Sequence, residues 1–439
     1  MRTDEGASWR RRLPVLAIAA AGFALTLRIF WPGVMTYDAA YIYSYIAAGR
    51  AGDWQSPLMT ALWGVIDPIA PGAGSMFLLI AALYWLAFAV LALALARRSP
   101  WLGPALLLLA LAPPAFCFVG IIWRDVLLAG AWLLAAGLAY TVVQRRDAWR
   151  LAAQTLALGL LAFGFLLRPN ALFAAPILAA YLVWPAGFDL KRAAVLYVPA
   201  TLVLALLMPL VYYGLLGARH ENPLHAIFVF DLGGITHFTK QNQFPVTWTA
   251  EQAALVTDGC YRPTDWDIYW TRDPCRFVMA KLEADKIFGS SALAEAWLRA
   301  LAAHPLAYLE HRAAVMTNFL AHQNLTMWTT DIAHPEKTVF ADNPWFMGLK
   351  TLHDRLMATP LFRAGTWLLL CMLWCWLGWR RRATPSGAFV IGVCGSAVVY
   401  LATFLPTGVA ADFRYALWAV MAGLAGTIMM AVRDPSPSA

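Results

Sequence analysis

The chain contains a series of apolar segments, each long enough to cross a lipid bilayer. A helix needs about 20 mostly apolar residues to span the hydrocarbon core. With 61% hydrophobic and only 13% charged residues, the chain has too few charges to cover a water-soluble surface. The sequence therefore predicts an all-α polytopic membrane protein with about ten spans, at about residues 13–31, 76–96, 101–118, 126–143, 151–167, 171–186, 194–214, 362–379, 387–404 and 415–432.

Basic clusters alternate along the connections between these segments. Every second connection carries one, and the other connections carry single arginines. Because short cytoplasmic connections are enriched in Lys and Arg, we predict that both termini are cytoplasmic and that nucleic acid is not a partner of this chain, despite its net charge of +8. The clusters are Arg10–Arg12, Arg97–Arg98, Arg145, Arg146 and Arg150, Lys191–Arg192, Arg380–Arg382, and Arg433.

The first segment is expected to be a retained span. No small-residue cleavage site follows Phe30-Trp31-Pro32, so a cleaved signal peptide is not predicted. The alanine-rich spans and the modest size of the chain favour a bacterial inner membrane, with membrane lipids as its surroundings.

Two outward-facing segments interrupt the spans. Residues 217–361 hold 15 of the 25 acidic residues and predict a mainly helical periplasmic insert domain. Residues 1–216 then form an N-terminal membrane module that includes a first outer loop at 32–75, and residues 362–439 supply the last spans. Inside the insert, apolar periodicity predicts helices at Ala292–Ala303 and Tyr308–Leu320, and turns are predicted at Asn222-Pro223, Gly233-Gly234 and Asn343-Pro344.

The insert contains two cysteines, Cys260 and Cys275. An oxidising compartment would favour a disulfide between them. The sequence leaves two unpaired thiols equally open, and we predict that Cys260 and Cys275 form a disulfide. The other four cysteines lie in or beside spans, where packing is the usual role of a free cysteine.

The first outer loop carries the strongest candidate for chemistry. Residues 39–48 predict a short helix that ends at Gly49, with tyrosines at four-residue spacing on one side and Asp38 at its start. Asp38 is open to two interpretations, because Asp is among the best helix N-caps and is also a common catalytic base. As a base it would have an aromatic wall on one side, which would exclude water and raise its basicity. The tyrosines are Tyr37, Tyr41 and Tyr45.

This loop resembles that of the polyprenyl-phosphate-sugar-dependent glycosyltransferases of the GT-C superfamily, such as protein O-mannosyltransferases and bacterial aminoarabinose transferases. The resemblance rests on Asp38 ahead of the tyrosine-bearing helix, then Gly52-Asp53-Trp54, then Gln55-Ser56-Pro57-Leu58. The chain departs from the family pattern in two ways. Where the family has an acidic pair, this chain has a single Asp38 followed by Ala39. The family's histidine before the proline is also absent. No cofactor or metal is therefore predicted, although a divalent cation is possible in such a family.

Three further motifs on the predicted outer side resemble elements of the same families, in the same order. They are Ile122-Trp123-Arg124-Asp125, Arg168-Pro169-Asn170 and Asp412-Phe413-Arg414-Tyr415. Taken alone, Asp125 could be a helix cap, and each arginine could be an interfacial anchor.

The resemblance implies a membrane glycosyltransferase that moves a sugar from a polyprenyl-phosphate donor to a glycan, lipid or protein acceptor of the cell envelope. Asp38 would be the catalytic base, and Asp125 would be a second acidic residue of the catalytic site. Arginine suits a lipid phosphate because its planar guanidinium makes bidentate contacts, so the phosphate-binding candidates are Arg124, Arg168 and Arg414. The substrate-binding candidates are Tyr37, Tyr41, Tyr45, Asp53, Gln55 and Asn170.

Two other classes of protein fit the same spans. A transporter or flippase for a lipid-linked or anionic solute would carry charges along its pathway, but few lie inside the predicted spans, Arg28 being the clearest. A non-catalytic subunit of an envelope-assembly machine would tolerate an isosteric Asn at position 38.

Overall fold

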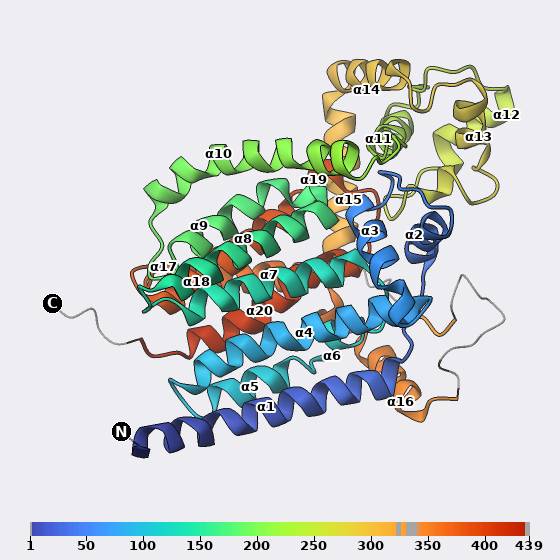
Figure 1. Ribbon diagram of the computed structural model, residues 1–439. Coiled ribbons are helices and arrows are strands. Elements are labelled where there is room, and N and C mark those ends of the chain that lie inside the picture. The colour runs from blue at the N-terminus through green and yellow to red at the C-terminus, as the bar shows by residue number, and fades with distance from the viewer. Residues whose placement is uncertain (1, 322–325, 331–339, 341, 435–439) are drawn as a thin grey trace.

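The structure is a computed structural model that describes residues 2–321, 326–330, 340 and 342–434. Within these residues the regular structure is helical, and the β-pairing consists of isolated bridges (Figure 1). The predicted all-α class is therefore confirmed. The apolar core of the bundle is built by α1 (Arg2–Phe30), α4 (Ala73–Ala96), α5 (Leu102–Leu109), α6 (Pro113–Phe116), α7 (Arg124–Thr141), α8 (Ala148–Leu167), α9 (Ala175–Val183), α10 (Leu190–Pro209), α17 (Ala364–Trp379), α18 (Pro385–Ala402), α19 (Phe404–Thr407) and α20 (Leu417–Met430).

Across the described residues, six helical segments are long and apolar enough to cross a membrane. They are Arg11–Phe30, Ala73–Ala96, Ala148–Leu167, Leu190–Leu215, Pro385–Thr407 and Phe413–Met430. The chain is thus a membrane-embedded helical protein.

The other four predicted spans are not among these six segments, so the count of ten stays a prediction. Residues 101–118 divide into α5 and α6, because Pro113 and Pro114 cannot continue the preceding helix. Residues 171–186 begin with a short 3₁₀ turn at Pro169–Phe173 before α9. The remaining two segments are α7 and α17, of 18 and 16 residues.

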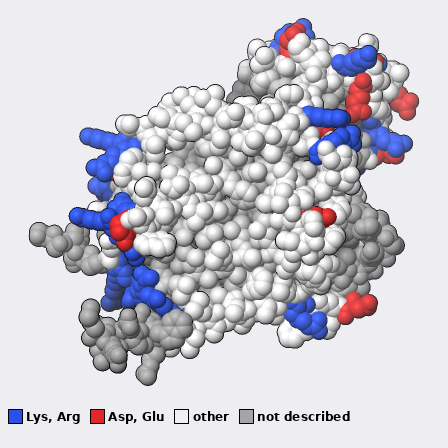
Figure 2. All heavy atoms as spheres, in the orientation of Figure 1, with Lys and Arg blue, Asp and Glu red and all other residues white. Residues whose placement is uncertain are grey.

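The basic residues gather at one end of the helix bundle. Lys and Arg side chains cluster at the end where α1 begins and α20 ends, while the rest of the bundle face shown is largely uncharged (Figures 1 and 2). The clusters follow the ends of α4, α7 and α17 and lie in the first turn of α10. This segregation of charge is what the alternating pattern predicts. Which end faces the cytoplasm stays a prediction.

A smaller helical lobe lies at the opposite end of the bundle (Figure 1). It has its own apolar core, which runs from Ala226 to Val315, whereas residues from Phe319 onward pack in the bundle. The insert holds α11 (Leu224–Thr239), α12 (Ala250–Ala254), α13 (Phe277–Ala284), α14 (Ser291–Ala303), α15 (Pro305–Ala321) and α16 (Pro344–Leu356).

Several local predictions for the insert are confirmed. Cys260 and Cys275 form a disulfide, and the two amphipathic patterns correspond to α14 and α15. Asn222 takes a left-handed conformation, with φ of 58°, just before α11. Asn343 caps α16, its side chain accepting from the backbone N–H groups of Trp345 and Phe346.

The turn predicted at Gly233-Gly234 is wrong, because both glycines lie inside α11. Their small size serves packing instead of chain reversal. A Cβ at Gly233 would lie 2.1 Å from the hydroxyl of Tyr269, and one at Gly234 would lie 2.3 Å from the ring of His311. Close approach of helices therefore outweighs the low helix propensity of glycine here.

A buried ion network joins the lobe to the bundle. The carboxylate of Asp231, fully buried in α11, lies 2.6 Å from Arg312 and accepts a 2.7 Å hydrogen bond from Trp297. Arg312 also donates to the carbonyl oxygen of Gly408 at 2.7 Å, next to the start of the last span.

We predict that the two ends of the molecule face opposite sides of the membrane. A Ser291→Cys variant places a thiol on the exposed start of α14, and an Arg146→Cys variant places one at the basic end. The native cysteines give little background, since Cys260 and Cys275 are paired and the free ones are buried or half-buried. A membrane-impermeant maleimide should label Ser291→Cys on spheroplasts and label Arg146→Cys only after the inner membrane is opened. The reverse pattern would overturn the predicted orientation.

Candidate active site

The candidate residues of the first outer loop lie on α2 (Tyr37–Ala47) and just before α3 (Pro57–Ile66). Thr36 occupies the N-cap position of α2, and Asp38 lies in its first turn. The carboxylate of Asp38 does not cap the helix. It accepts a 3.0 Å hydrogen bond from Gln55 and forms a 2.6 Å ion pair with Arg414.

Arg414 connects this loop to the start of the last span. Its guanidinium pairs with Asp38 and also lies 2.9 Å from the carboxylate of Asp412. It stacks 5.2 Å from the ring of Trp123, which in turn donates to the hydroxyl of Thr36. The side chain of Arg414 is only 15% exposed, so these contacts fix its position.

A second ion pair lies beside the first one. Asp125, in the first turn of α7, is 2.5 Å from Arg168 at the end of α8, and both side chains are at least nine-tenths buried. Asp125 is therefore an ion-pair partner and not a helix cap. The ring of Tyr415 stacks against Arg168 at 4.8 Å and against Arg414 at 5.1 Å, so it separates the two pairs.

Arg124 lies in the same region as Arg168 and Arg414 but has no paired carboxylate among the described residues. Among the described residues it forms no ion pair, and its buried Nε has no hydrogen-bond partner. It nevertheless lies within electrostatic range of Asp38, Asp125 and Arg168. The side chain is half-buried, and a buried N–H without a partner is costly, so this position favours an anionic ligand.

The local charges control the ionisation of Asp38. Burial opposes ionisation, but the positive charges of Arg414, Arg124 and Arg168 outweigh it and hold the pKa of Asp38 below its ordinary value. The expectation that an aromatic wall makes this carboxylate more basic is therefore wrong. The reason is that the nearby guanidinium groups stabilise the charged form.

The tyrosines of α2 have another role in this structure. The hydroxyls of Tyr41 and Tyr45 both donate to the carboxylate of Glu221, the first at 2.8 Å. Tyr37 is 72% exposed and packs edge-on against Trp328. No sequence signal singled out Glu221, because it lies 180 residues from Tyr41.

Asp53 anchors the first outer loop. Its carboxylate accepts from the backbone N–H of Glu221 at 2.6 Å and from the hydroxyl of Tyr213 at 2.8 Å. A β-bridge between Gly52 and Arg219 runs alongside. Within the described residues Asp53 forms no ion pair with the three arginines, and its contacts hold the loop in place.

The two remaining candidates contact the cluster at its edges. Gln55 is 7% exposed, and its Oε1 has no partner among the described residues. The backbone at Gln55 is positioned by the next residue, Ser56. Ser56 caps α3 and donates to the carbonyl of Leu166 at 2.9 Å. Asn170 lies in the 3₁₀ turn after α8, within hydrogen-bonding reach of Tyr400.

The structure therefore brings together Asp38, Asp125 and the three arginines, at the end of the bundle opposite the basic clusters. Asp412 joins them, although the sequence analysis quoted it only as part of a motif. Within the described residues, no group of three or more His, Cys, Asp or Glu side chains is arranged to hold a metal ion.

No protein-family model matches the chain, and neither a curated protein nor a solved structure is significantly similar to it.

We predict that Asp125→Asn destabilises the protein by about 3–5 kcal/mol, because it leaves Arg168 as an uncompensated buried charge. The double variant Asp125→Asn/Arg168→Gln removes both charges and should recover part of that loss. Thermal unfolding of the purified protein in detergent measures both. Purely additive effects of the two changes would show that the pair is not coupled.

Proposed function

We propose that the chain is a GT-C-type membrane glycosyltransferase that takes a sugar from a polyprenyl-phosphate donor. The observation that carries this proposal is the convergence of Arg124, Arg168 and Arg414 around Asp38. These residues come from the first turn of α7, the end of α8 and the start of the last span. Such a group offers anion binding and a proton acceptor within one site.

In this proposal Arg124 receives the donor phosphate. It is the arginine of the cluster whose charge is not already neutralised by an ion pair. Arg168 and Arg414 keep their carboxylate partners at rest, so they are less available to a phosphate than Arg124 is. A charge-assisted, bidentate contact is the mode in which arginine binds phosphate.

Asp38 would act as the general base. Its lowered pKa keeps it ionised at neutral pH. As the acceptor hydroxyl or amine attacks the anomeric carbon, its proton passes to a carboxylate oxygen of Asp38. The new bond forms to the anomeric carbon while the carbon–oxygen bond to the polyprenyl phosphate breaks, and the phosphate leaves with the electron pair. A direct displacement of this kind inverts the anomeric centre.

An aromatic group beside the site is suited to the acceptor. Trp54 of the first outer loop packs against Trp266 and Trp270 of the lobe, with ring centroids 5.8 and 5.2 Å apart. Trp270 is 39% exposed. The backbone beside Trp266 pairs with Val409 and Ala410, just before Asp412. Aromatic faces of this kind stack well on sugars, and we propose an envelope glycan, lipid or protein acceptor on the periplasmic side of a bacterial inner membrane.

We predict that Asp38→Asn abolishes detectable transfer, since general-base help contributes about 10²–10⁴-fold in rate. Asn keeps the shape of the side chain and still accepts a hydrogen bond. The measurement is mass spectrometry of cell-envelope glycans from cells that lack the gene and from cells complemented with each variant. The control is Asp258→Asn, which removes a carboxylate from an exposed ion pair with Lys240. A normal glycan profile with Asp38→Asn would remove the base from the proposal.

We predict that Arg124→Gln weakens binding of undecaprenyl phosphate about 10- to 100-fold, the range expected for a hydrogen bond to a charged group. The binding is measured with purified protein in detergent. Arg50→Gln is the control, because Arg50 is an exposed arginine at the end of α2 that stacks on Tyr45. Unchanged affinity in Arg124→Gln would mean that this arginine does not contact the phosphate.

A further inference from the structure

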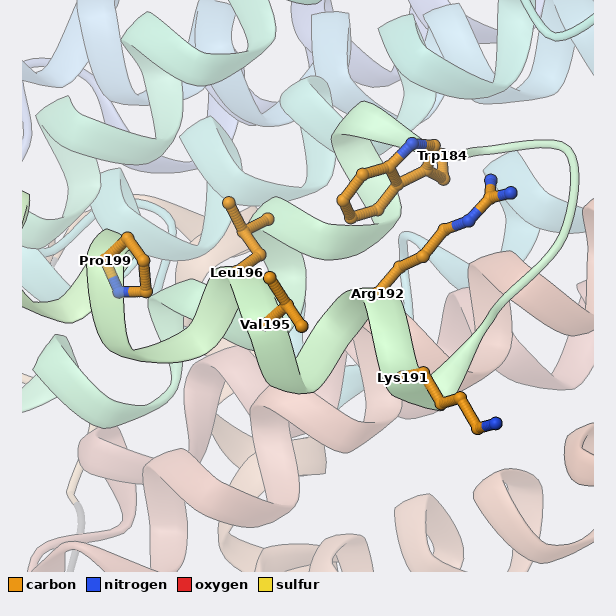
Figure 3. Close-up of a pocket in the computed structure, with 6 residues that line it drawn as sticks. All are labelled: Trp184, Lys191, Arg192, Val195, Leu196 and Pro199. Carbon is orange, nitrogen blue, oxygen red and sulfur yellow. The ribbon is translucent and has the colours of Figure 1, made fainter.

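A pocket lies at the basic end of the bundle, far from the candidate active site. It has a volume of about 410 Å³ and is open to its surroundings, and this volume is within the range of small-molecule sites. It lies where α9 is followed by α10, and its lining residues are Trp184, Lys191, Arg192, Val195, Leu196 and Pro199 (Figure 3).

The pocket is lined almost entirely by apolar surface, and the charged ends of Lys191 and Arg192 lie outside it. In Figure 3, Arg192 extends beside Trp184, whereas Lys191, from the same first turn of α10, points away from Trp184. Neither cation forms an ion pair within the described part of the chain. A neighbouring carboxylate, that of Asp189, caps α10 by accepting from the backbone N–H of Arg192 at 3.0 Å. The positive charges are therefore available to an external anion.

The helix that carries these residues faces lipid along its length. Only 6% of the most apolar stretch of Leu190–Leu215 is buried inside the protein, and α10 lies at the outside of the bundle against α9 (Figure 1). A row of large side chains on this helix is more than half exposed: Val195, Val198, Leu202, Val203, Leu206, Leu210 and Leu215. Acyl chains are the natural neighbours of such a surface.

We infer that this pocket binds an anionic diacyl phospholipid. The headgroup phosphate would lie against Lys191 and Arg192. One acyl chain would follow Leu196 and Pro199. Trp184 would lie at the level of the membrane interface, where Trp is enriched. Basic pockets between membrane helices at the cytoplasmic face are suited to anionic headgroups.

The polyprenyl-phosphate donor is not the occupant. The pocket is at the start of α10, whereas the other end of the same helix leads to Tyr213 and its contact with Asp53. At 1.5 Å per residue, the intervening stretch spans about 30 Å, which is the thickness of the hydrocarbon core. The pocket and the arginine cluster therefore serve opposite leaflets.

The test is native mass spectrometry of the purified, delipidated full chain titrated with phosphatidylglycerol and with phosphatidylcholine. Each Lys or Arg near an anionic lipid contributes about a fivefold preference, or roughly 30-fold for two. Wild type should show this preference for phosphatidylglycerol, and Lys191→Gln/Arg192→Gln should lose it. Arg11→Gln/Arg12→Gln removes the same charge from the same end on α1 and should keep it.

A second variant tests the apolar part of the pocket. Leu196→Trp fills the groove but retains both cations, so it should weaken both lipids while leaving the ratio between them. Equal binding of phosphatidylglycerol to wild type and Lys191→Gln/Arg192→Gln would overturn the proposal. Competition by free glycerol phosphate as strong as by the whole lipid would do so too, as would preferential displacement by undecaprenyl phosphate. None of these outcomes depends on whether the protein transfers a sugar.

Discussion

The ion pair between Asp38 and Arg414 is the contact on which the arrangement of the site depends. It joins the loop after the first span to the start of the last one, across 376 residues of sequence. Because Arg414 is only 15% exposed, the attraction is weakly screened. Gln55 approaches Asp38 from the opposite side. The carboxylate, in the first turn of α2, is thereby held at a fixed point beside the arginines.

The small lobe, which comes from the middle of the chain, reinforces this arrangement. Its Thr264 and Trp266 pair with the backbone at Val409 and Ala411, and Arg312 binds the carbonyl of Gly408. These three contacts fix the segment directly before Asp412. Glu221 does the same for the first outer loop through the two tyrosine hydroxyls of α2. The lobe therefore clamps both segments that supply the Asp38–Arg414 pair.

The sequence predicted what depends on local pattern and missed what depends on distant contacts. Periodicity located α2, α14 and α15, because amphipathic spacing is a local property. It could not show that Arg168 pairs with Asp125 or that Glu221 accepts a hydrogen bond from Tyr41. In each pair the two residues lie far apart in the sequence. The sequence predicts a turn at the glycine pair of α11. It could not show the helix instead, because the close packing against Tyr269 exists only in the folded structure. The lowered pKa of Asp38 has the same origin, in charges brought together by the fold.

That lowered pKa has a consequence for the proposed reaction. With Arg414 bound to it, Asp38 is ionised but a poor proton acceptor, because protonation would break a favourable ion pair. A donor phosphate near Arg124 would add negative charge to a cluster in which three arginines face Asp38, Asp125 and Asp412. In the proposed enzyme, the added charge would draw the guanidinium of Arg414 away from Asp38 and would raise the proton affinity of the carboxylate. In the proposed enzyme, the base would therefore become effective only once the donor is bound, so an acceptor is not deprotonated in an empty site.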